Sequence, residues 1–261
     1  MTDKCREDEE SAMEFSNVYE DDERAAAYSK LEFPGTYYLA FRDLPVIISE
    51  NVTGKKALDF GCGTGRSSRF LDTLGFQTIG IDISEEMIGL ARKNNPKGDY
   101  RLVKEGDFGE LEESSFDLIL SAFPFDNIPT MEQKVMNLKG LRNLLANDGK
   151  LVNLVSTPEI YTHEWASFST KDYAENTDAK SGDTVRIIQM DTEDKRPVTD
   201  ILWTHDSYLE TYRQSQLELV ATYRPLAKDN EPYDWVNETR IAPWVIYVLK
   251  RFIPKEGPTP E

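Results

Sequence analysis

The segment ALDFGCGTGRSSRFL, residues 57–71, constrains the fold more than any other part of the chain. An apolar stretch that ends at Phe60 runs into glycines at positions 61, 63 and 65, and a helical pattern follows. Such glycines let the backbone turn sharply and approach a ligand closely, and the helix presents its free N-terminal amides to that ligand. The sequence therefore predicts a cofactor site between a buried strand and a helix.

Two kinds of nucleotide-like cofactor use such a turn. Dinucleotide binders require G-x-G-x-x-G, which would place the third glycine at position 66. That position is Arg66, and the third glycine is Gly65. The spacing therefore disfavours NAD.

With Asp59 two residues ahead of the first glycine, DFGCGTG resembles the first motif of the class I S-adenosylmethionine (SAM) dependent methyltransferases. The later segments GIDISEEM, EGDFGEL, FDLILSAFPFDNIP and LRNLLANDGKLVNLV resemble the family's next motifs, the last of them a helix, a turn and the fifth strand. Strands alternating with helices independently favour a parallel sheet. The resemblance implies an α/β, Rossmann-like, seven-stranded and mostly parallel sheet with helices on both faces. LELVATYRPL and IAPWVIYVLKR fit its last two strands, the final one antiparallel.

The resemblance also implies roles for individual residues in holding SAM. Asp82 stands where the family places the acid that accepts both ribose hydroxyls, although any ribose-binding α/β fold needs such an acid. Asp107 would accept from the adenine amino group, Phe108 would meet the ring, and Met87 would pack on it or belong to the core. The remaining cofactor candidates are Asp59, Gly61, Cys62, Gly63, Thr64, Gly65, Ile83, Gly106 and Ser121.

The chain divides into regions of different composition. Residues 1–16 are charged and poor in large apolar side chains, which predicts a disordered acidic tail. Residues 17–52 resemble the N-terminal helical lid of small-molecule methyltransferases, with helical stretches on both sides of Pro34-Gly35. Residues 53–251 form the predicted SAM-binding domain, and residues 252–261 form a C-terminal tail.

The lid contains donors suited to the carboxylate of SAM. Guanidinium and phenol groups donate well to a carboxylate in a partly closed pocket. By analogy with relatives, Arg42 and Tyr28 are the candidates for this contact, while Tyr37 and Tyr38 are further candidates. The alternative is a packing surface rich in tyrosine.

An insertion at about residues 157–204 follows the fifth strand and predicts the substrate pocket. Its second half, TVRIIQMDTEDKRPVTDILWTH, predicts a β-hairpin that covers the cofactor. His163 and Asp126 are the candidate catalytic bases, the alternatives being a loop histidine and turn chemistry. The candidate substrate contacts are Phe123, Phe125, Asn127, Tyr161, Trp165 and Tyr38.

Composition narrows the classes of protein and partner. A net charge of −17, with 47 acids against 30 bases, disfavours nucleic acid and favours a small neutral or cationic substrate. The longest apolar run is too short to cross a bilayer, and the start has no apolar signal region, so we expect a cytoplasmic protein without membrane contact, a monomer or homodimer. The two cysteines fit neither a disulfide framework nor a zinc site, and no metal is predicted.

These observations predict a SAM-dependent methyltransferase (EC 2.1.1.-) acting on a small molecule, with oxygen slightly favoured over nitrogen or carbon as the acceptor atom. Three alternatives remain. Methylation of a protein stays open, since an acidic surface could receive a basic tail. A catalytically inactive SAM-binding regulator would keep the same motifs. An NAD-dependent reductase would require an atypical glycine turn.

Overall fold

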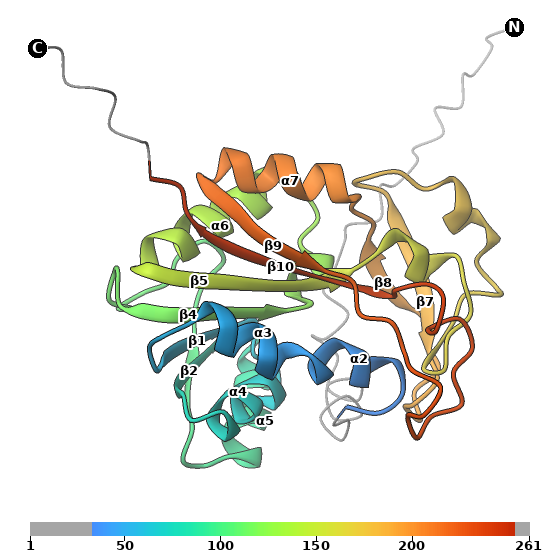
Figure 1. Ribbon diagram of the computed structural model, residues 1–261, viewed down its shortest axis with the longest axis horizontal. Helices are drawn as coiled ribbons and strands as arrows, with labels where there is room; N and C mark the ends of the chain where they lie inside the picture. The colour runs from blue at the N-terminus through green and yellow to red at the C-terminus, as the bar shows by residue number, and fades with distance from the viewer. Residues whose placement is uncertain (1–32, 254–261) are drawn as a thin grey trace, which may run out of the picture.

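The computed structural model describes residues 33–253, which are built around a central seven-stranded sheet (Figure 1). Its strands are β1 (Lys56–Phe60), β2 (Gln77–Asp82), β3 (Asp99–Leu102), β4 (Phe116–Ala122), β5 (Leu145–Ser156), β9 (Leu217–Tyr223) and β10 (Trp244–Arg251). The sheet order is β3-β2-β1-β4-β5-β10-β9. Strands β1 to β5 are parallel, and β10 is antiparallel to both β5 and β9. The predicted fold class is confirmed.

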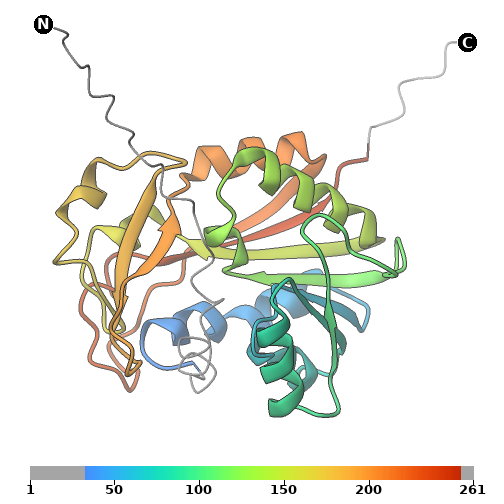
Figure 2. The ribbon, with the colours of Figure 1, turned by 180° about the vertical axis from the view of Figure 1, so that it is seen from behind.

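Helices cover both faces of the sheet (Figures 1 and 2). They are α2 (Thr36–Arg42), α3 (Leu44–Asn51), α4 (Arg66–Thr73), α5 (Glu85–Asn94), α6 (Met131–Leu144) and α7 (His205–Gln214). Helices α6 and α7 lie on one face, and α3, α4 and α5 lie on the other. Ser84 caps α5, since its hydroxyl accepts from the Met87 amide at 3.2 Å.

The two largest hydrophobic clusters lie on opposite faces of the sheet, and a smaller third cluster contains Ile88, Ala91 and Tyr100. Along β4, Leu118 and Leu120 belong to one cluster, and Ile119 between them belongs to the other. Strand β10 alternates in the same way at Ile246 and Tyr247. Because successive side chains point to opposite faces, these continuous apolar runs mark strands covered on both sides.

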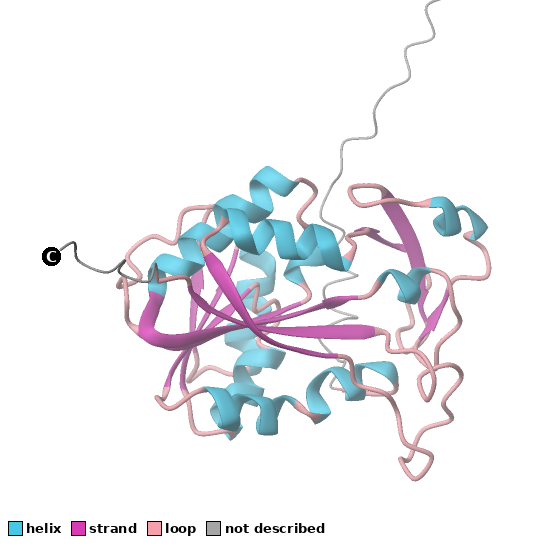
Figure 3. Ribbon diagram, turned by 45° about the horizontal axis from the view of Figure 1, so that its top comes forward, coloured by secondary structure: helices cyan, strands magenta, loops and turns pink. Residues whose placement is uncertain are grey.

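The insertion forms a second, smaller sheet beside the carboxyl end of the large one (Figure 3). It contains the short helices η3 (Pro158–Tyr161) and η4 (Ala174–Asp178) and the strands β6 (Phe168–Ser169), β7 (Thr184–Gln189) and β8 (Val198–Ile201). Strands β7 and β8 pair antiparallel, so the predicted hairpin is present. Another short helix, η2 (Pro124–Asn127), follows β4.

Two expectations about the chain differ from the structure or lie outside it. The turn expected before the fifth strand falls within β5, which begins directly after α6 at Leu145, because the register against β4 shifts between Leu145 and Lys150. The predicted acidic tail, the first stretch of the lid and the C-terminal tail from residue 254 lie outside the described residues. None of the helices within residues 33–253 is long and apolar enough to cross a membrane.

Candidate functional site

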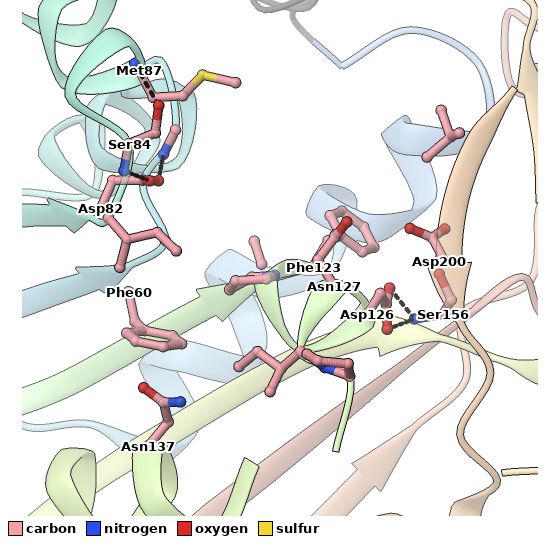
Figure 4. A pocket seen from close by; sticks show the side chains of 18 of the residues that line it. Phe60, Asp82, Ser84, Met87, Phe123, Asp126, Asn127, Asn137, Ser156 and Asp200 are labelled. Atoms are coloured by element: carbon pink, nitrogen blue, oxygen red, sulfur yellow. Dashed lines mark hydrogen bonds between the residues drawn. The ribbon is translucent and has the colours of Figure 1, made fainter. Parts of the chain in front are cut away.

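A cavity of about 340 Å³ opens beyond the carboxyl ends of β1, β2 and β4, where parallel α/β sheets bind their ligands. One half is lined by the glycine turn and by residues after β2 and β3. The other half is lined by η2 and by residues of α2, η3, β8 and β10 (Figure 4). Its volume is in the range of small-molecule sites, roughly 300–1,000 Å³.

The three glycines of the turn all have positive φ, at +67°, +51° and +81° for Gly61, Gly63 and Gly65. A Cβ at Gly61 would lie 2.6 Å from the Pro124 ring, and one at Gly65 would lie 2.7 Å from the Tyr100 hydroxyl. A Cβ at Gly63 would meet nothing within 4 Å. At Gly63, therefore, the backbone lines the cavity and has open space where a side chain would be.

Alanine at Gly61 should destabilise the protein more than alanine at Gly63. Both substitutions force a side chain into the left-handed region, at a cost of about 1–2 kcal/mol. Gly61→Ala also collides with the rigid Pro124 ring and should cost roughly a further 1–3 kcal/mol. Urea unfolding of both variants measures the difference, and equal losses would contradict the geometry.

Asp82, at the end of β2, is held by backbone amides. Its Oδ2 accepts from the Gly63 amide at 2.8 Å, and its Oδ1 accepts from the Ser84 amide at 2.9 Å. Burial raises the pKa of this carboxyl, while these amide hydrogen bonds oppose the rise. The carboxylate lines the cavity beside the glycine turn, so the two strongest predicted features of the site are in contact.

Asp59 lies beneath the turn and does not line the cavity. It is fully buried, and its Oδ2 accepts from the hydroxyls of Ser67 at 2.7 Å and Ser68 at 2.6 Å in the first turn of α4. Burial raises the pKa of Asp59 to about 6, against these hydrogen bonds. The carboxyl therefore ties β1 to α4 and fixes the turn between them.

The free energy of unfolding should depend on pH through Asp59. Its pKa is about 6 in the folded chain and 3.8 when exposed, so the folded state binds this proton more tightly. Stability from this group is therefore gained as pH falls from about 7 to about 4. Relative to Asp59→Asn, the wild type should become more stable by up to about 3 kcal/mol over that range.

Urea unfolding at several pH values measures this difference. Asp148→Asn, at an exposed carboxylate that is not among the groups acting on the Asp59 pKa, is the control. A wild-type to Asp59→Asn difference that stays constant between about pH 7 and 4 would contradict the argument.

Apolar side chains form the wall next to Asp82. Phe60, Met87 and Phe108 line the cavity there, together with Ile83, whose side chain is exposed. The Phe60 and Phe108 rings lie 6.1 Å apart between centroids. This wall suits the flat face of an aromatic base.

The far half of the cavity contains a buried group of polar side chains. Both oxygens of Asp126 accept from the Ser156 amide, the shorter contact being 3.0 Å, and the Tyr208 hydroxyl donates to Oδ1 at 3.3 Å. The fully buried Lys134 ammonium donates to the Phe125 carbonyl. Burial raises the pKa of Asp126 and lowers that of Lys134, because both lose solvation of their charged forms.

A second carboxylate, Asp200 of β8, lies in this half (Figure 4). The Tyr161 hydroxyl donates to its Oδ2 at 3.1 Å. Sequence reasoning missed Asp200, although a signal exists: in VTDIL it occupies the same strand face as Val198 and Leu202, and all three are buried. A charged residue on the inward face of a short strand is a candidate site residue.

Aromatic rings complete the far half. Trp244 stacks on Tyr37 at 5.7 Å between centroids, Phe123 lies 4.7 Å from Trp244, and Phe168 lies 5.3 Å from Tyr37. All four line the cavity. Phe123 also has φ of +73°, a costly conformation for a bulky residue, and it begins the short helix that presents Asp126.

The match to known proteins centres on the glycine turn and the strands around it. Residues 58–153 match the family model for a methyltransferase domain. A solved S-adenosylmethionine-dependent methyltransferase from Clostridium acetobutylicum superposes with a TM-score of 0.58 at 14% identity, covering 90% of this chain and 96% of that one. Residues 58–153 thus form a methyltransferase domain. The predicted family, and SAM as the cofactor of that family, are confirmed.

Curated relatives of this methyltransferase domain match over shorter lengths. An uncharacterized protein of Haemophilus influenzae is 33% identical over 150 residues, 52% of this chain and 56% of that protein. A ubiquinone biosynthesis O-methyltransferase of Burkholderia vietnamiensis is 32% identical over 84 residues, 31% of this chain and 36% of that enzyme. The chain thus spans at most 56% of the length of these two relatives.

Eleven of the site residues predicted for a methyltransferase line the cavity. They are Tyr37, Gly61, Gly63, Asp82, Ile83, Met87, Phe108, Phe123, Asp126, Asn127 and Tyr161. Others do not line it: Asp59, Cys62, Thr64, Gly65, Gly106, Ser121, Phe125 and Trp165. Tyr28 lies outside the described residues.

Asp107 does not line the cavity, and its contact with the adenine amino group stays a prediction. Its side chain is exposed, and Oδ1 accepts from the Gly109 amide at 2.9 Å. The Asp107 amide donates to the Lys104 carbonyl at 3.0 Å. The loop after β3 therefore closes as a tight turn, and Lys104 and Glu105 of this loop line the cavity.

Three further candidates lie away from the cavity wall. Arg42 pairs with Glu231 at 2.6 Å and with Asp43 at 2.7 Å, so its donors are occupied by protein carboxylates. The ring of Tyr38 lies 5.2 Å from that of Tyr233.

His163 is the third, and it does not support the predicted role of a base. Its Nδ1 lies 3.1 Å from the Glu159 carbonyl oxygen and 3.0 Å from the Thr162 hydroxyl. These are the contacts of a loop histidine. Within residues 33–253, no group of three or more His, Cys, Asp or Glu side chains is arranged to hold a metal ion.

Proposed function

We propose that this protein transfers a methyl group from SAM to a small-molecule acceptor. The observation that carries the proposal is the cavity that runs from the glycine turn and Asp82 to the buried carboxylates Asp126 of η2 and Asp200 of the insertion. A transferase of this kind needs its two substrates in one enclosed space, with the acceptor atom in line with the methyl carbon and the sulfur.

The residues divide between cofactor and acceptor. Asp82 would accept the ribose hydroxyls, and the wall of Phe60, Met87 and Phe108 would hold the adenine. The acceptor would occupy the aromatic half beside Asp126. When bound, SAM supplies an electrophilic methyl on a sulfonium.

Asp126 is the base that fits this arrangement, in place of His163. It is buried, lines the cavity, and has a raised pKa, which makes its carboxylate a stronger base than one in water. An acceptor hydroxyl would lose its proton to Asp126 as its oxygen attacks the methyl carbon and the C–S bond breaks. Oxygen is therefore the slightly favoured acceptor atom.

Calorimetric titration with SAM, S-adenosylhomocysteine and NADH tests the proposal. We expect micromolar binding of the first two ligands and none of NADH. Binding of NADH alone would instead support the reductase, and SAM binding without product formation across phenols, acids and amines would support an inactive regulator.

A further inference from the structure

One half of the cavity lies opposite the wall of Phe60, Met87 and Phe108 that we assign to the cofactor. This half contains hydrogen-bond acceptors surrounded by aromatic side chains. Asp126 and Asp200 are 4% and 8% exposed, and both line the cavity. Figure 4 shows them on the same side of the cavity, close to Ser156 and far from Asp82 and Met87. Two carboxylates in one enclosed space favour a ligand that brings positive charge.

A third acceptor lies in the same lining. Oδ1 of Asn127 is buried and has no hydrogen-bond partner among the described residues. Asn127 follows Asp126 in η2 and also lines the cavity. Because a buried polar atom without a partner is costly, a bound donor would satisfy it.

Within residues 33–253, the ammonium of Lys134 lies beside this group and does not face the cavity. Lys134 is fully buried, does not line the cavity, and donates to the Phe125 carbonyl. Its ammonium also lies 4.9 Å from the centre of the Trp203 ring. Lys134 offsets part of the negative charge of Asp126 and Asp200 without lining the cavity. The side chains of this group that line the cavity carry hydrogen-bond acceptors.

We propose that the acceptor carries a protonated amine, which Asp200 and Asn127 hold beside Asp126 within the aromatic wall. An ammonium group has three donors, which matches the acceptors available. Tyr37, Phe123, Phe168 and Trp244 supply the faces against which a cation or an attached aromatic ring packs favourably. The proposal rests on the proposed function, since it assigns the acceptor of the same cavity.

A matched ligand series tests the charge that the cavity selects. The full-length protein, saturated with S-adenosylhomocysteine at pH 7, is titrated with 2-phenylethylamine, 2-phenylethanol and phenylacetate. The three share a ring and a short chain and differ in the terminal group. We expect the amine to bind at least about tenfold more tightly than the alcohol, and phenylacetate to bind most weakly.

Asp200→Asn should reduce the preference for amine over alcohol by about tenfold, because a charge-assisted contact is lost. Glu193→Gln, which removes one charge from the exposed turn of the same hairpin, should keep the wild-type preference. Asn127→Ala provides a second variant should Asp200→Asn fail to fold, and it should also weaken amine binding.

The outcomes separate this proposal from the proposed function. Equal or tighter binding of the alcohol or phenylacetate overturns the amine proposal, as does intact preference in both cavity variants. Failure of the amine to bind while S-adenosylhomocysteine binds normally also overturns it and leaves the proposed function standing. Loss of S-adenosylhomocysteine binding to the wild type overturns both.

Discussion

Asp82→Ala should weaken SAM binding by about 100-fold or more, which places it beyond ordinary calorimetric detection. The proposed contact joins one carboxylate to two ribose hydroxyls, and each hydrogen bond to a charged group contributes about 1.5–3 kcal/mol. The substitution also removes the acceptor that fixes the Gly63 amide at 2.8 Å. Both effects act on the same half of the cavity.

Two controls separate loss of the contact from loss of the fold. Asp72→Ala removes an exposed carboxylate from α4 and should bind SAM like the wild type. The thermal unfolding of Asp82→Ala should show a single cooperative transition. Micromolar SAM binding by Asp82→Ala would exclude Asp82 as the ribose acceptor.

Trp244→Ala should be the most destabilising of the substitutions considered, at roughly 3–5 kcal/mol. The indole is 2% exposed, contacts three other rings of the cavity wall, and donates from Nε1 to the Thr36 carbonyl at 2.8 Å. It therefore joins β10 to α2 across the far half of the cavity. Urea unfolding measures the loss.

Trp235→Ala is the matched control, since that indole is only partly buried and lies 4.9 Å from the Tyr233 ring between centroids. We expect less than about half the loss of Trp244→Ala from it. Trp244→Phe keeps an aromatic ring and loses the hydrogen bond, so it should fall between the two. Equal losses at positions 244 and 235 would show that Trp244 does not have this joining role.

The sequence predicted the parts of the site that local geometry determines. In a parallel sheet, the carboxyl ends of neighbouring strands lie at the same edge. The glycine turn after β1 and the acid at the end of β2 are therefore brought together, and the Gly63 amide donates to Asp82. The hairpin was predictable for the same reason, since alternation and a polar turn are local signals. The last antiparallel strand followed from the family resemblance.

The parts that were missed depend on contacts between distant segments. Arg42 has the right chemistry, but Glu231, 189 positions away, occupies it. Trp244 lies at the cavity because β10 pairs with β5 in a register that places it opposite Ser156. The pattern of apolar residues in the sequence does not predict that register. Such placements follow from tertiary packing and not from local pattern.

The position of β10 has a consequence for how the protein is made. This strand is the last of the sheet in sequence, yet it lies in the interior, between β5 and β9. A chain still emerging from the ribosome can pair β1 to β5 and must leave the edge of β5 open until β10 has been synthesised. Open edges recruit other strands. We infer that the interval before β10 inserts is when the nascent protein most needs a chaperone.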